Sequence, residues 1–162
     1  DAFFRPAISA VKATPVASFI LLVLLWTGRN QVPAVISGLM VLPVVWENLT
    51  QGIRSTDQQL LELSRAYRFS RGKTVRLVYL PSLKPYLLSA VTTAMGLAWK
   101  SGVAAEVLCL PRPGIGTEIN HAKQAFETAD LFAWTAVVIC LSLLMERFLT
   151  RLIQRRREGA AV

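Results

Sequence analysis

The sequence contains few residues from which a metal site or a disulfide could be built. Among its 162 residues there are two cysteines and one histidine. Cys140 lies inside the apolar run 137–141, where a thiol behaves as a small buried hydrophobic side chain, so a bridge to Cys109 is not expected. His121 has no second histidine or cysteine at ligand spacing. These absences argue against a zinc site and against a disulfide scaffold.

Catalytic groupings are missing as well. No pair of carboxylates stands at a useful spacing, and no serine or cysteine has a plausible base near it. We therefore expect a protein that is not an enzyme and that holds no cofactor or metal of its own. The first residues, Asp1–Pro6, also lack the basic start, apolar core and cleavage site of a signal peptide. Since there is no initial methionine, we expect the natural N-terminus to lie upstream.

Apolar residues are what the chain has in excess. They make up 53% of the sequence, and the mean hydropathy is +0.44, above the usage of soluble domains. Four apolar stretches predict membrane-crossing helices at about 13–28, 31–49, 84–107 and 131–149. Each charge-free run falls short of about 20 residues, so a soluble helical bundle stays an alternative. We predict a single all-α transmembrane domain over 1–162.

The charges are distributed unevenly between the two predicted sides of the membrane. The segment Glu47–Lys84 holds seven basic residues, and the C-terminal tail adds five: Arg147, Arg151, Arg155, Arg156 and Arg157. The opposite loop, Glu106–Asp130, has four acidic residues against two basic ones. This asymmetry follows the positive-inside rule and places the segment 55–82 and the C-terminus in the cytoplasm. Because the basic residues flank membrane ends, we expect no nucleic-acid partner.

The cytoplasmic segment contains one predicted amphipathic helix. Ser55, Thr56 or Asp57 can cap its start. Its apolar positions recur at three and four residues and form one stripe: Leu60, Leu63, Ala66 and Tyr67. Such a helix can lie against lipid, against its own bundle or in the groove of a partner. The periodicity does not choose among these three surfaces.

A resemblance to a known family favours the groove of a partner. Glu62-Leu63-Ser64, Arg68 and Val78-Tyr79-Leu80-Pro81 stand at the spacing of the EAA loop, which reads Glu-Ala-Ala, Gly and Ile-x-Leu-Pro. That loop is typical of the permease subunits of binding-protein-dependent ABC importers. Further segments resemble the nitrate, sulfonate and taurine branch of these permeases: Ala13-Thr14-Pro15, Leu24-Leu25-Trp26-Thr27-Gly28, Gly96-Leu97-Ala98-Trp99, Ala104-Ala105-Glu106 and Gly114-Ile115-Gly116. The resemblance covers nearly the whole chain.

The resemblance implies the type I ABC importer permease fold, with N-terminal spans that this chain lacks. It further implies a cytoplasmic ABC ATPase that binds the ATP, an external substrate-binding protein, a second permease copy and a small anionic or organic solute. The residues implied to contact the ATPase are Leu60, Glu62, Leu63, Ser64, Ala66, Tyr67, Arg68, Leu80 and Pro81. The protein would lie in the inner membrane among its lipids.

Two departures from the family pattern matter. Ser64 replaces an alanine, a change that still permits close packing. Arg68 replaces the glycine whose positive φ makes the turn after the helix. Gly72 follows four residues later, and we hypothesise that the turn moves there.

Lys100 is the notable charge within the predicted third span. An ionisable residue there often marks a solute path, so Trp99 and Lys100 are candidate path residues. Lys100 could equally extend to the outer surface and leave its ammonium in water. On the outer side, Ile115, Ile119, Ala122, Phe126 and Ala129 predict a helix lying on the bundle. The alternative function is a small multi-pass channel or membrane scaffold without an ATPase partner.

Overall fold

The computed structural model describes residues 4–158, and within them the chain forms helices and no strand. The side chains of Arg5 and of residues 154–158 lie outside the description, so the predicted roles of Arg155, Arg156 and Arg157 lie outside it too. In chain order, the elements are α1 (Arg5–Ala13), α2 (Val16–Trp26), α3 (Val32–Arg54), α4 (Gln58–Ala66), α5 (Arg71–Thr74), the π-helix η1 (Val75–Tyr79), α6 (Leu80–Cys109), α7 (Ile115–Gln124) and α8 (Thr128–Glu158).

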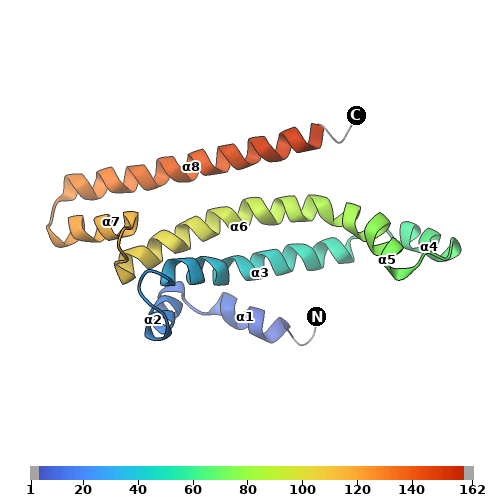
Figure 1. Cartoon of the computed structure of the whole chain (residues 1–162), viewed down its shortest axis with the longest axis horizontal. Coiled ribbons are helices and arrows are strands. Elements are labelled where there is room, and N and C mark those ends of the chain that lie inside the picture. The colour runs from blue at the N-terminus through green and yellow to red at the C-terminus, as the bar shows by residue number, and fades with distance from the viewer. Residues whose placement is uncertain (1–3, 159–162) are drawn as a thin grey trace.

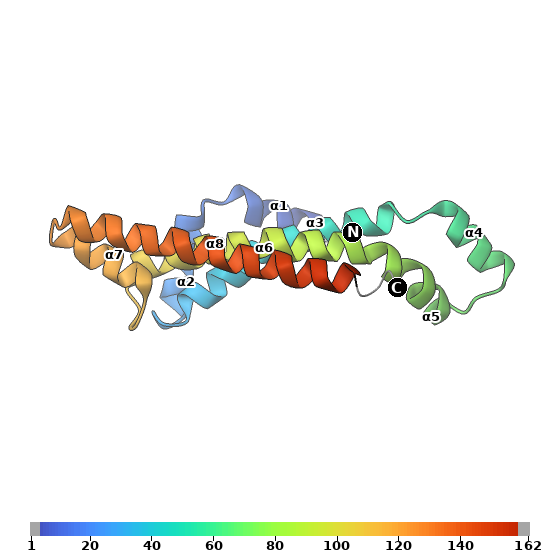
Figure 2. The same ribbon diagram turned by 90° about the horizontal axis from the view of Figure 1, so that it is seen from above.

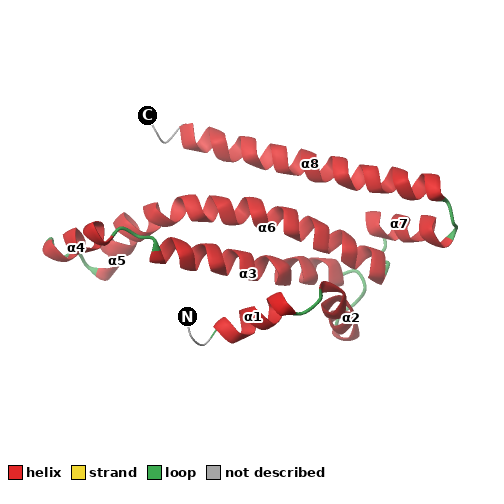
Figure 3. Ribbon diagram, turned by 180° about the vertical axis from the view of Figure 1, so that it is seen from behind, coloured by secondary structure: helices red, strands yellow, loops and turns green. Residues whose placement is uncertain are grey.

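Three long helices give the molecule its shape. α3 and α6 form an antiparallel pair along its length, and α8 lies on the other side of α6 (Figures 1 and 3). Among the short helices, α2 and α7 lie at one end and α4 and α5 at the other, whereas α1 lies along α3 (Figure 2). α8 runs toward the end that carries α4 and α5 (Figure 1). The all-α fold predicted from the sequence is confirmed.

The first predicted span, 13–28, contains the 11-residue helix α2, which Pro15 separates from α1. Thr14 adopts an extended conformation (φ −81°, ψ 131°) because a residue before proline is disfavoured in the helical region. α1 therefore ends at Ala13, and α2 leaves it at an angle of 105°. α1 instead lies against α3, where Lys12 pairs with Glu47 and the rings of Phe4 and Trp46 lie 5.5 Å apart.

Length and composition identify fewer crossing helices than the sequence suggested. Within residues 4–158, α3 and the Thr128–Ile153 part of α8 are long and apolar enough to cross a membrane. A third crossing exists if the bent α1–α2 pair counts as one broken span. α6 is not among them although it has 30 residues; it carries Lys84, Lys100 and Glu106. The four-span topology therefore stays a prediction.

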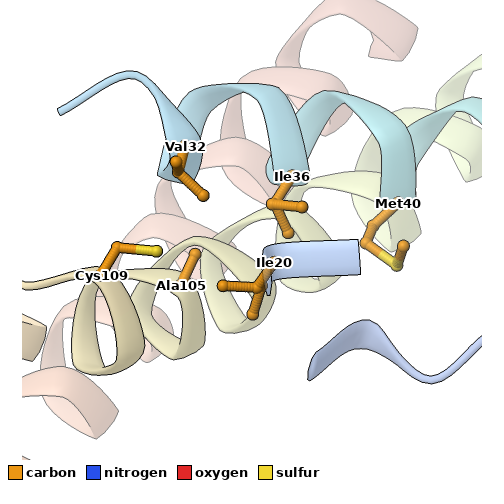
Figure 4. Close-up of a cluster of buried hydrophobic side chains, with 6 residues drawn as sticks. All are labelled: Ile20, Val32, Ile36, Met40, Ala105 and Cys109. Carbon is orange, nitrogen blue, oxygen red and sulfur yellow. The ribbon is translucent and has the colours of Figure 1, made fainter. Parts of the chain in front are cut away.

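The buried core is small and lies where α2, α3 and α6 meet. Its side chains come from all three helices: Ile20, Val32, Ile36, Met40, Ala105 and Cys109 (Figure 4). Elsewhere large apolar side chains face outward, among them Trp26 at 90% exposure and Phe132 at 75%. None of the apolar window of α8 is buried within the structure. Such a surface suits lipid or further protein as its surroundings, rather than water.

The corner between α6 and α7 is fixed by one carboxylate and one glycine. Glu106 accepts a hydrogen bond of 2.8 Å from the backbone N–H of Gly116, in the first turn of α7. A carboxylate is favoured there because the first N–H groups of a helix lack intrahelical partners. Asn120 adds a bond of 2.8 Å to the carbonyl of Val107. The helix predicted from Ile115 onward forms and lies on α6, although it ends at Gln124 rather than continuing to Ala129.

The turn after α4 forms at Arg68, so the hypothesis that it moves to Gly72 is wrong. Arg68 has φ 51°, and no described glycine has positive φ. The N–H of Phe69 reaches the carbonyl of Ser64 at 2.9 Å, and that of Arg68 reaches Arg65 at 2.9 Å. These two bonds form the Schellman motif that commonly ends helices. Gly72 lies inside α5, whose start is capped by the Ser70 hydroxyl.

Gly116→Ala is expected to destabilise the protein. An added Cβ would lie 2.5 Å from the Cβ of Glu106 and 2.7 Å from the backbone oxygen of Val103, so α7 must shift away from α6. We expect a loss of about 1–3 kcal/mol, as for overpacked sites, measured by thermal unfolding in detergent. Gly38→Ala in α3 is the control, because a Cβ there meets nothing within 4 Å. Equal melting temperatures for the two variants would contradict the close approach.

Arg68→Gly is expected to stabilise the end of α4. Placing a residue other than glycine in the left-handed region costs about 1–2 kcal/mol. Glycine avoids this cost, although part of the gain is offset because glycine loses more chain entropy on folding. Amide exchange over residues 64–72 should therefore slow in this variant. Arg65→Gly places the same change inside the helix, where glycine costs about 1 kcal/mol, and should speed exchange. Faster exchange in Arg68→Gly would argue against the turn.

Candidate functional site

The segment 55–82 forms an arm that extends beyond the α3–α6 pair (Figures 1 and 2). α4 begins at Gln58, and the carboxylate of Asp57 caps it by accepting the N–H of Gln59 at 2.8 Å. Of the three cap candidates from the sequence, Asp57 is the one used. The Thr56 hydroxyl instead donates to the carbonyl of Gly52 at 3.2 Å.

α4 presents its apolar stripe outward. Leu60, Leu63 and Tyr67 are 44%, 54% and 70% exposed, and Ala66 is exposed as well. The buried residue of this helix is Ser64, at 4%, whose hydroxyl donates to the carbonyl of Leu61 at 2.7 Å. The stripe found in the sequence therefore does not pack on the chain itself. It is an unpartnered surface, and the small residue faces inward.

The charged predicted residues share this exposed arm. Glu62 and Arg68 are exposed, as is Arg65 beside them. α4 touches the rest of the chain mainly at η1, whose buried residue is Val78. The structure thus brings Leu60, Glu62, Leu63, Ala66, Tyr67 and Arg68 onto one accessible helix and its turn, with Ser64 beneath them.

Leu80 and Pro81 lie within a continuous helical rod that joins the arm to α6. α5, η1 and α6 follow one another without a loop from Arg71 to Cys109. The N–H of Leu80 reaches back five residues to the carbonyl of Val75, the bond of a π-helix. Pro81 has no N–H to donate to Leu77, and its ring crowds that carbonyl, which explains the wider turn just before it. Both Leu80 and Pro81 are exposed.

Trp99 and Lys100 lie on the side of α6 that faces α8. Both line a groove of about 650 Å³ between these two helices, together with Thr92, Ser142 and Glu146. Lys100 is exposed, whereas Trp99 is half-buried and lies well inside α6.

Sequence reasoning missed two carboxylates. In the sequence Glu106 is marked only as part of the family segment Ala104-Ala105-Glu106, although this segment and Gly114-Ile115-Gly116 stand ten residues apart and touch through Glu106 and Gly116. Glu146 received no role, although it is a charge on an otherwise apolar face of α8 and lines the same groove as Lys100. Ser142 and Glu146 stand four residues apart and therefore share one face of a helix, and this spacing could have indicated a polar position on α8.

Comparisons with known proteins agree with this architecture. The profile of the family described as "Binding-protein-dependent transport system inner membrane component" matches residues 1–158. A permease protein of Bacillus subtilis named for aliphatic sulfonates transport is 27% identical over 96% of this chain and 56% of its own length. The riboflavin transport system permease protein of Chloroflexus aurantiacus is 30% identical, over 90% of this chain and 57% of its own.

The taurine transport system permease protein of Escherichia coli is 26% identical over 93% of this chain and 54% of its own length. The chain thus spans about half the length of the curated relatives it matches. These relatives confirm the predicted branch, and the family is one of transport permeases rather than enzymes. With helices, exposed arm and family profile in agreement, the chain belongs to the family of binding-protein-dependent transport system inner membrane components.

Proposed function

We propose that this chain is the part of an ABC importer permease that couples a cytoplasmic ATPase to the solute pathway. The observation that carries the proposal is the outward apolar stripe of α4, held at the tip of an arm. A soluble protein would gain by burying Leu60, Leu63 and Tyr67. An amphipathic helix whose apolar residues remain free is suited to the groove of a partner.

The rod from α5 to α6 supports a coupling role. α4 is joined to it through the turn at Arg68 and contacts η1, so a force on α4 acts on the start of the rod. A helix transmits displacement along its axis because each turn is hydrogen-bonded to the next. ATPase closure would therefore move α6, and with it the groove lined by Lys100. Leu80 and Pro81 stand where the π-helix gives way to the α-helix.

The remaining partners follow from the family and the charge pattern. The inner membrane would hold the protein with its C-terminus and α4 in the cytoplasm, because basic residues gather at both. A second copy would complete the pathway, and an external binding protein would deliver the solute. The relatives named for sulfonates and taurine favour a small anionic or organic solute. A channel or scaffold without an ATPase is the alternative.

Leu63→Ser is expected to weaken binding of the partner ABC ATPase. Burying a leucine side chain contributes about 1.5–3 kcal/mol, so its loss should reduce affinity roughly 10- to 100-fold, measured by co-purification and titration in detergent. Gln59→Ser changes an exposed polar residue of the same helix and serves as the matched control. A wild-type permease that binds no ATPase would favour the channel or scaffold.

Lys100→Met is expected to reduce uptake of an anionic solute. A hydrogen bond to a charged group contributes about 1.5–3 kcal/mol, which corresponds to about tenfold or more in uptake at subsaturating solute. Lys100→Arg keeps the charge and should retain most transport. Uptake is measured in cells with expression matched by immunoblot. Unchanged uptake in Lys100→Met would instead mean that the ammonium extends to the outer surface and lies off the pathway.

A further inference from the structure

The groove between α6 and α8 contains two opposite charges. It has a volume of about 650 Å³, and Lys100 of α6 and Glu146 of α8 both line it, among mainly apolar residues of the two helices. Both charged side chains are exposed and therefore open to a solute. An ionisable group within a membrane protein is costly unless it is paired or faces a solute or water-filled cavity. The presence of both groups in one groove therefore requires an explanation.

The two charges stand at opposite ends of the groove. α6 and α8 run antiparallel, because α8 returns from α7 toward the end that carries the arm (Figures 1 and 3). Glu146 lies at the level of Thr92, with which it also shares a second, smaller cavity. Thr92 precedes Lys100 by eight residues. At 1.5 Å per residue, the two charged positions are therefore about 12 Å apart along the helix axis.

Both side chains lean into the groove rather than toward the ends of their helices. In an α-helix each Cα–Cβ bond is tilted toward the N-terminus. Lys100 therefore leans over Gly96 toward the arm, whereas Glu146 leans over Ser142 toward α7, and Gly96 and Ser142 line the same groove. Because the helices are antiparallel, the ammonium and the carboxylate lean toward each other.

The described part of the chain neutralises neither charge. Among the side chains that the structure describes, Lys100 and Glu146 have no ion pair and no side-chain hydrogen bond. The hydroxyls of Thr93 and Ser142, which line the groove as well, have no partner among them either. The groove thus offers a cation, an anion and two hydroxyls, with open space between the two charges.

We propose that this groove binds a small zwitterionic solute, with its sulfonate or carboxylate on Lys100 and its ammonium on Glu146. The inference rests on the proposed transport function and narrows the solute from an anion to a molecule that carries both charges. A simple anion would pair with Lys100 but would leave Glu146 without a counter-charge. A zwitterion neutralises both ends of the groove at once.

Binding to the full permease in lipid nanodiscs, without the ATPase, tests the groove separately from coupling. The probes are 3-aminopropane-1-sulfonate and 4-aminobutanoate, each compared with the matched anion that lacks the ammonium, propane-1-sulfonate and butanoate. We expect at least one zwitterion to bind about tenfold or more tightly than its matched anion, because hydrogen bonds between charged groups are the strong ones. Equal affinity within both pairs would overturn the proposal.

Two single variants separate the roles of the charges. Glu146→Gln should weaken binding of the zwitterion about tenfold and leave that of the anion unchanged, whereas Lys100→Met should weaken both. Lys84→Met removes another exposed lysine of α6, outside the groove, and should change neither. If Glu146→Gln weakened zwitterion and anion equally, the carboxylate would have a structural role and the proposal would be wrong.

A charge exchange tells a binding role from a structural one. Lys100→Glu alone should abolish binding of the zwitterion, and adding Glu146→Lys should restore it, because the solute can then bind in the reverse orientation. A folded double variant that binds no zwitterion would contradict the proposal. Co-purification of the ATPase tests the proposed function independently. A permease that holds its ATPase but does not prefer the zwitterion would overturn this inference alone.

Discussion

Close approach between α6 and its neighbours is the constraint on which the rest of this structure depends. The buried residues of α6 are all small, namely Ala90, Ala94, Ser101, Ala105 and Cys109. Small side chains let helix backbones come near one another, which is the main means of packing where lipid removes the hydrophobic incentive. Ser37 of α3 uses this proximity to donate to the carbonyl of Ala98 at 2.9 Å. The other helices then pack around the joined pair of α3 and α6.

The same tight packing explains why α6 connects the two ends of the molecule. At one end Gly116 lets α7 reach the backbone of α6, and Glu106 holds it there. At the other end α6 continues through η1 into α5 without a loop. Pro81 would break a regular α-helix, but the π-turn before it keeps the rod continuous. A rod fixed at one end and carrying an exposed arm at the other can transmit movement along the length of the molecule.

The polar groups at the edges of this framework contact neighbouring helices, and these contacts determine their roles. Lys12 of α1 pairs with Glu47 of α3. This pair holds α1 along the bundle, although the chain bends sharply at Pro15, just after α1. Trp99 lies within α6, away from its ends, and lines cavities shared with α3 and with α8. An apolar helix such as α8 gains little specificity from its leucines, because any rotation exposes similar side chains to lipid. A few polar contacts are then sufficient to select one register.

The sequence by itself determined the helical class, the family, the apolar stripe of α4 and the side on which basic residues gather. The helical class, the stripe and the basic side follow from composition and local periodicity, which act over a few residues, and the family follows from the resemblance of short ordered motifs to it. Only the tertiary structure decided that the stripe faces outward, since Ser64 rather than Leu63 lies beneath α4. It also decided that Arg68 accepts a left-handed conformation and that Glu106 meets Gly116. Periodicity fixes which residues share a face, whereas contacts between distant segments fix where that face points.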